Sequence, residues 1–252
     1  MTSPRTTGSP GPAVNHVLLP KQGHSLAECE DAFACNRSTM RFAVADGATE
    51  SFDAASWAQR LATRWVNSTG LLTEEDFWTW LNSEGQAHND SWNRLDLPWY
   101  SMEKRGAGSF AAFVGIEIQP DKAWHAIALG DSCLLHCRTT SRVLTIFPVS
   151  GSNDFGCAPV LAPSCTELNI HARSSIARQA GGLADGDRFL LLSDAIAAWY
   201  IKLNEQQDYK RISDFEELLK QEDEAPMSDF LELERLEARL KDDDVAIVCI
   251  EF

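Results

Sequence analysis

The sequence lacks any long uninterrupted run of apolar residues. No stretch reaches the roughly 18 apolar residues that a membrane-spanning helix needs. Residues 1–10 also have no apolar centre of the kind that a secretory signal carries. These absences mark the chain neither for export nor for a membrane, and we expect a cytoplasmic protein.

Cysteine gives little sign of disulfide bonds or of a zinc site. There are seven cysteines, an odd number, and they are scattered among apolar residues, which is typical of reduced, buried side chains. Cys133 and Cys137 are spaced so that an extended segment would place both on one face, but no second cysteine pair follows them. We therefore do not predict a zinc site.

Basic residues are too few for a nucleic-acid-binding protein. The chain has 22 Lys and Arg against 37 Asp and Glu, which gives a formal charge of −15. Phosphate backbones are bound by basic patches, and the sequence shows none. An acidic protein instead attracts cations or basic partner segments.

The sequence does contain enough apolar material for a sizeable core. The 252 residues are 44% hydrophobic, which fits a globular protein. Residues 1–12 are rich in Pro, Ser, Thr and Gly and are predicted to form a disordered tail. Residues 13–252 are predicted to form a single domain.

The apolar pattern alternates between strand-like and helix-like segments. Apolar residues at helical spacing predict helices over 51–67 and 73–95, and His88 in the second is expected to be structural rather than a ligand. Residues 150–166 are expected to be irregular. Strands are expected at 14–19, 109–118, 122–129, 132–138 and 142–147, the last four as an antiparallel meander, and helices at 195–203 and within 205–241.

Acidic residues stand where several apolar strands begin or end. Asp46, Asp131 and Asp194 each close a strand, one of Asp242 to Asp244 opens the last strand, and Glu30 or Asp31 opens another. Taken alone, Asp46-Gly47 could be an ordinary turn. A cluster of carboxylates is strongly disfavoured by mutual repulsion unless cations neutralise it. Oxygen ligands without His or Cys favour magnesium or manganese.

Glu30 and Asp31 are adjacent, so an extended chain would point them to opposite faces. We therefore expect only one of them to face the site easily, with a water molecule carrying any contact from the other. Two solvated charges at the entrance to a strand are the simpler interpretation.

The order of these motifs resembles the metal-dependent, type 2C (PPM-type) protein serine/threonine phosphatases, and in particular the stand-alone bacterial members. The resemblance runs from about Lys21 to Phe252. Six pieces carry it: Glu30-Asp31, Val44-Ala45-Asp46-Gly47, Gly108-Ser109, Gly130-Asp131-Ser132, Leu192-Ser193-Asp194 and Asp243-Asp244-Val245-Ala246-Ile247-Val248.

The resemblance implies an α+β fold, a four-layer α/β/β/α sandwich of two antiparallel sheets flanked by helices. It also implies two Mn²⁺ or Mg²⁺ ions, which lower the pKa of a water that attacks phosphorus in phosphoserine or phosphothreonine. Asp46 would bridge the ions, Gly47 would offer its carbonyl, and Asp194 and Asp243 would complete the coordination. Glu30 would act through water. The implied partner is a phosphoprotein, whose kinase the enzyme would oppose.

Three positions depart from the family pattern. An Arg that holds the substrate phosphate in many members falls at Leu26, and His24 or Lys21 could replace it, although neither reproduces a bidentate Arg. Ala195 stands where the family commonly has Gly. Asp131 would belong to a third metal site whose usual partner acid falls at Ala198.

Two other functions stay open on the sequence. The missing Arg is compatible with a phosphatase-like module that has lost efficient catalysis and serves in binding or regulation. A hydrolase of small phosphate esters is the other alternative, because a metal centre does not itself choose the leaving group.

Overall fold

The computed structural model describes residues 11–92, 101–138, 143–156 and 158–252. Their strands form two antiparallel sheets. One has the order β1–β11–β10–β6–β7, and the other has the order β2–β3–β4–β5–β9, with the short β8 paired to β4. The strands are β1 (Ala13–Leu19), β2 (Asp31–Asn36), β3 (Arg41–Gly47), β4 (Phe110–Ile118), β5 (Ala123–Leu129), β6 (Cys133–Arg138), β7 (Val143–Phe147), β8 (Ala162–Pro163), β9 (Ala177–Gly182), β10 (Asp187–Leu192) and β11 (Val245–Glu251).

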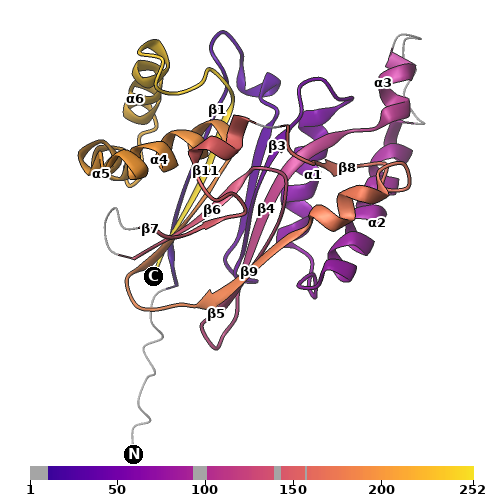
Figure 1. Cartoon of the computed structure of the whole chain (residues 1–252), viewed down its shortest axis with the longest axis horizontal. Coiled ribbons are helices and arrows are strands. Elements are labelled where there is room, and N and C mark those ends of the chain that lie inside the picture. The colour runs from indigo at the N-terminus through magenta and orange to yellow at the C-terminus, as the bar shows by residue number, and fades with distance from the viewer. Residues whose placement is uncertain (1–10, 93–100, 139–142, 157) are drawn as a thin grey trace, which may run out of the picture.

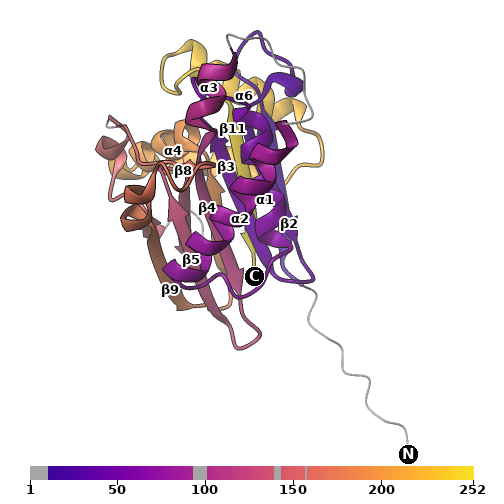
Figure 2. The same ribbon diagram turned by 90° about the vertical axis from the view of Figure 1, so that its right-hand side faces the viewer.

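Helices cover the outer faces of both sheets. Figure 1 shows one group of helices on each side of the two sheets, and Figure 2 shows α1 and α2 over the β2–β5 side. The predicted four-layer α/β/β/α sandwich is therefore confirmed. The helices are α1 (Ala54–Val66), α2 (Glu74–Trp92) and α3 (Ser101–Ala107) on one side, and α4 (Asp194–Gln206), α5 (Tyr209–Leu218) and α6 (Ala225–Leu236) on the other. Short 3-10 helices are η1 (Leu26–Glu28), η2 (Ser152–Gly156) and η3 (Ile170–Ser175).

The core lies in three layers between these elements. Phe42, Val44 and Val114 of one sheet pack with Leu191 and Val248 of the other, and all five are fully buried. Separate apolar clusters lie between each sheet and its helices. Because both faces of the central strands are covered, their sequences are continuously apolar, and an acid can stand only where a strand ends.

Four details of the secondary structure differ from the sequence predictions. The expected meander is broken, because β5 pairs with β9 while β6 pairs with β10 in the other sheet. The segment Gly130-Asp131-Ser132 therefore crosses between sheets. β9 was not predicted, since it is an exposed edge strand without apolar alternation. The short α3 was also missed, and residues 150–166 contain η2 and β8.

The chain ends are placed only in part. Residues 1–10 of the predicted tail lie outside the described residues, as do residues 93–95 of the predicted second helix, and β1 begins at Ala13. Among the helices that the structure describes, none combines the length and the apolar character needed to cross a membrane.

His88 fastens α2 to the loop that follows Asp46. Its Nε2 lies 3.0 Å from Ser109 Oγ, and Ser109 Oγ donates to the carbonyl of Phe52. The His88 ring also packs against Trp57 and Trp92. It is 3% exposed, in agreement with the structural role predicted for it. Burial lowers the pKa of His88 to about 4, helped by Arg60 and opposed by Asp53.

We expect this buried imidazole to make folding sensitive to mild acid. Below the unfolded pKa of 6.5, the unfolded chain binds a proton at His88 that the folded chain refuses until about pH 4, so stability falls as pH falls through this window. Between pH 7.5 and 5 the loss is about 2 kcal/mol. The test is denaturant unfolding of wild type and His88→Gln at both pH values. The loss is the change, between pH 7.5 and pH 5, in the difference between their free energies of unfolding. A difference that does not depend on pH would contradict the expectation.

Candidate metal centre

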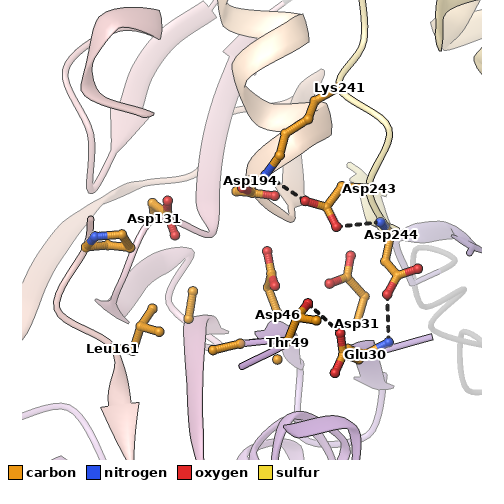
Figure 3. A pocket seen from close by; sticks show the side chains of 14 residues that line it. Glu30, Asp31, Asp46, Thr49, Asp131, Leu161, Asp194, Lys241, Asp243 and Asp244 are labelled. Carbon is orange, nitrogen blue, oxygen red and sulfur yellow. Dashed lines mark hydrogen bonds and ion pairs between the residues drawn. The ribbon is translucent and has the colours of Figure 1, made fainter. Parts of the chain in front are cut away.

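Seven acidic side chains meet at one end of the sandwich (Figure 3). They line a cavity of about 200 Å³. The acids are Glu30, Asp31, Asp46, Asp131 and Asp194, together with Asp243 and Asp244 just before β11. They come from segments far apart in the sequence, so the fold itself assembles the cluster.

Asp46 occupies the centre of the arrangement because of the pairing of its strand. In β3 it lies opposite Asp31 of β2 on one side and Ala112 of β4 on the other. A side chain at Gly47 would come within 2.8 Å of the carbonyl oxygens of Glu30 and Ala54. Glycine at this position therefore permits the close approach of the three backbone segments at the cavity floor.

Asp194 and Asp243 enter the cavity from the other sheet. Asp194 is the first residue of α4, directly after β10. The preceding Ser193 fixes this corner, since its N–H donates to the carbonyl of Ala246 (3.0 Å) and its Oγ accepts from the N–H of Ala246 (2.9 Å). The end of β10 and the start of β11 are thus tied together, and Asp194 and Asp243 are placed side by side (Figure 3).

Asp244 is a structural carboxylate of the same cluster. Its two oxygens accept from the backbone N–H groups of Lys21 and Glu30, each at 2.8 Å. It is 4% exposed. Asp244 therefore joins the start of β11 to the segment before β2 and positions Glu30, whose Oε2 accepts from Thr49 Oγ1 at 2.6 Å.

Burial and mutual repulsion raise the pKa values of several of these carboxylates. Burial raises the pKa of Asp46 well above its usual value, and the charges of Asp31 and Asp194 raise it further. Burial likewise raises the pKa of Asp31, although a hydrogen bond with Ser193 opposes the shift. Burial and then Asp194 raise the pKa of Asp131 to about 6. Asp31 Oδ2 is buried without a hydrogen-bond partner. The cluster therefore lacks positive charge.

Lys241 supplies one cation at the rim. Its Nζ lies 2.6 Å from Asp243 Oδ2 and 3.4 Å from Asp194 Oδ2 (Figure 3). Burial would lower its pKa, but the hydrogen bond to Asp243 and the charges of both aspartates raise it overall. One ammonium group cannot balance seven carboxylates, so most of the repulsion remains.

The donor set fits hard divalent cations. Carboxylate oxygens and the Gly47 carbonyl are the ligands that Mg²⁺ and Mn²⁺ prefer, and neither His nor Cys lines the cavity among the described residues. In the same part of the chain, no three potential ligands already stand close enough together to enclose an ion. Two of these carboxylates, Asp194 and Asp243, are paired with Lys241. To bind an ion, the carboxylates would have to move closer to one another.

The structure brings together most of the residues singled out in the sequence. Glu30, Asp46, Gly47, Asp131, Asp194 and Asp243 all line the cavity. Asp131 lies on the side away from Asp243 and Asp244, next to Leu161 (Figure 3). The side chain of Ala198 at the third-site position carries no ligand atom. The coordinating roles of these residues stay predictions.

The residues considered for phosphate binding lie elsewhere. Leu26 is 62% exposed in η1. His24 is also exposed, and Lys21 contacts Glu30 Oε2 at 3.5 Å, but neither of them lines the cavity. Their replacement of the missing Arg stays untested. In the described part of the chain, the cation that does line the cavity is Lys241.

Sequence reasoning missed the importance of Asp31, Asp244 and Lys241. The expectation that only one of Glu30 and Asp31 faces the site is wrong, because both line the cavity. Glu30 precedes β2 and is not bound by its alternation. The adjacent acids were visible in the sequence, but the pairing of Asp31 with Asp46 was not.

Comparisons with known proteins identify the fold. The chain matches no protein-family model and no curated protein at a significant level. It is similar to the structure of the photosystem II phosphatase PBCP, with a TM-score of 0.63 and 14% identity over 96% of this chain and 99% of that chain. It is also similar to the Mycobacterium tuberculosis serine/threonine phosphatase PstP, with a TM-score of 0.60 and 15% identity over 96% of this chain and 99% of that chain.

A further similar structure contains metal. The catalytic domain of PstP in complex with two manganese ions has a TM-score of 0.59 and 15% identity, over 94% of this chain and 97% of that chain. At such identities the similarity establishes the fold alone. This chain has the two-sheet sandwich fold of type 2C phosphatases.

Proposed function

We propose that this chain is a metal-dependent phosphatase that hydrolyses phosphoserine and phosphothreonine in proteins. The observation that carries the proposal is the acidic cavity, where seven carboxylates converge and Lys241 contacts two of them. Such a cluster needs cations for stability. The fold shared with serine/threonine phosphatases, one of them solved with manganese, supports the same conclusion.

In this proposal the chain holds two Mn²⁺ or Mg²⁺ ions. Asp46, Asp194, Asp243 and the Gly47 carbonyl would hold the ions, while Glu30 and Asp131 lie at the edges of the cavity. When bound, the ions supply the Lewis acidity that activates water and offsets charge on phosphoryl oxygens. Asp244 orients Glu30, and Ser193 sets the corner that carries Asp194. Ala112 and Leu161 provide an apolar wall.

Cysteine chemistry does not compete with this assignment. Burial, together with the charges of Asp31 and Asp244, raises the pKa of Cys29 to about 12. The pKa of Cys133 is raised by burial and then by Asp131. These two thiols near the acids stay protonated at neutral pH, and neither can serve as a thiolate nucleophile.

The test is hydrolysis of a phosphothreonine peptide, beside a generic aryl phosphate, with manganese, with magnesium and with a chelator. We expect metal-dependent turnover that the chelator abolishes, with the peptide preferred. Preference for the aryl phosphate would indicate a hydrolase of small esters. No turnover with metal shown to be bound would indicate a binding or regulatory module instead.

The cellular setting follows from the same proposal. The six described cysteines are free, which suits a reducing compartment such as the cytoplasm. The substrates would be phosphoproteins made by a serine/threonine kinase.

We expect Asp194→Ala to reduce turnover far more than Asp131→Ala. Asp194 follows the end of β10 and lies beside Asp243, whereas Asp131 lies on the far side of the cavity. The resemblance places the usual partner acid of Asp131 at Ala198, which has no ligand atom in its side chain. The expected losses are about a thousandfold and about tenfold, respectively. Steady-state kinetics at saturating manganese measures both. Equal losses would show that Asp131 belongs to a complete site.

A further inference from the structure

A second groove, of about 390 Å³, opens directly beside the acidic cavity. The two share Asp194 and Lys241, so they form one continuous surface. The groove is lined by Lys202, Arg239 and Lys241, and Asp194 is its one acid among the described residues. This local positive charge stands out on a chain whose formal charge is −15.

The groove has fixed walls. On one wall, the N–H and Oγ of Ser152 in η2 donate to the carboxylate of Glu205 in α4, at 2.9 and 2.5 Å. On the other, the Trp199 indole N–H donates to Glu234 Oε2 at 2.9 Å. These bonds tie η2 to α4 and the Trp199 ring of α4 to α6, so the groove exists before any ligand binds.

Small side chains keep the groove open and add no acid beyond Asp194 to its α4 wall. Ala195 and Ala198 lie on the α4 wall between Asp194 and Lys202. A carboxylate at either position would repel an anion and offset the lysines. At Ala198, where the family resemblance would place an acid, the methyl group removes that repulsion.

The three cations differ in what already neutralises them. Arg239 donates to both oxygens of Glu234, at 2.8 and 2.7 Å, and Lys241 contacts Asp243 and Asp194. Lys202 is exposed, and no ion pair forms to it within the described residues. Lys202 is therefore the cation available to an incoming anion, and Lys241 marks the junction with the acidic cavity.

We propose that this groove selects substrates that carry Asp or Glu beside the phosphorylated residue. The inference rests on the proposed function, which places the phosphorylated side chain in the acidic cavity. An extended peptide entering there passes Lys241, and its next residues lie along the groove. An acidic side chain then reaches Lys202, whose charge is unpaired, whereas a basic side chain is repelled. The groove is thus a specificity site, separate from the residues that act on phosphorus.

The test compares three phosphothreonine peptides that differ only in the residues flanking the phosphothreonine, which are Glu, Gln or Lys. We expect kcat/KM with manganese to be about tenfold higher for the Glu peptide than for the Gln peptide, and lowest for the Lys peptide. The Glu preference should weaken at high salt, because the lysine is exposed. Lys202→Gln should bring the Glu-to-Gln ratio close to one, and Lys202→Glu should reverse it.

Lys210→Glu is the matched control, because Lys210 is also exposed but lies in α5, outside the groove. It makes the same change of net charge and should leave the ratio unchanged. A similar loss of preference in Lys210→Glu would mean a general charge effect and overturn the proposal. Equal kcat/KM for the Glu and Gln peptides with wild type would also overturn it.

A binding measurement separates this inference from the proposed function. Fluorescence anisotropy with peptides that carry a non-hydrolysable phosphonate in place of phosphothreonine needs no turnover. If the protein has no hydrolytic activity but binds the Glu peptide more tightly in a way that depends on Lys202, the proposal for the groove is supported and the phosphatase function is contradicted. Hydrolysis with no preference among flanking residues would support the phosphatase function and overturn the proposal for the groove.

Discussion

Replacement of Asp46 by asparagine should reduce turnover of a phosphothreonine peptide by about a thousandfold or more while leaving the fold intact. Asp46 lies between Asp31 and Ala112 in the paired strands, at the centre of the acidic cavity. Asparagine has nearly the same shape but only one oxygen and no charge, so it cannot serve two cations at once. Steady-state kinetics at saturating manganese measures the loss.

The loss should be accompanied by no loss of structure. Because burial and neighbouring acids raise the pKa of Asp46, its charge is unfavourable in the metal-free fold, and its removal should not destabilise the protein. Asp185→Asn makes the same chemical change at an exposed turn and should leave turnover unchanged. An Asp46→Asn protein that is folded and turns over at the wild-type rate would remove Asp46 from the mechanism.

The sequence alone was enough to predict the fold class and the candidate ligands. Strands buried on both faces have continuously apolar sequences, so an acid at the end of such a run is easily recognised. Asp46, Asp131 and Asp194 were found in this way. Their order along the chain then pointed to the family, whose fold the structure has.

Other features depend on pairing between distant segments and could not be read from local sequence. The register that sets Asp31 opposite Asp46 joins two strands, and a shift of one residue would turn Asp31 away. The change of sheet at Asp131 has no local pattern, because β5 and β6 each look like members of one meander. Lys241 looked like one charge among many in an amphipathic segment, yet the chain brings it back to Asp194.

Addition of manganese to metal-free protein should raise its melting temperature by about 5–10 °C. Seven carboxylates line the cavity with Lys241 as the cation among the described lining residues, so repulsion in the metal-free state opposes folding. An ion that binds only the folded state at 100 times its Kd contributes about 2.7 kcal/mol. For a chain of this size each kcal/mol shifts the melting temperature by roughly 2–4 °C. Calorimetry with manganese and with chelator measures the shift without requiring activity.

The carboxylates should account both for the low melting temperature of the metal-free protein and for its rise with manganese. In chelator, Asp46→Asn should melt higher than wild type, because the pKa of the native carboxyl is raised in the fold and its ionisation at neutral pH therefore costs stability. In manganese it should gain little, because a central ligand has been lost. The two curves should then cross as manganese is added. A wild-type protein that melts at the same temperature with manganese and with chelator, or an Asp46→Asn protein with an undiminished manganese shift, would mean that the acidic cavity is not the metal site.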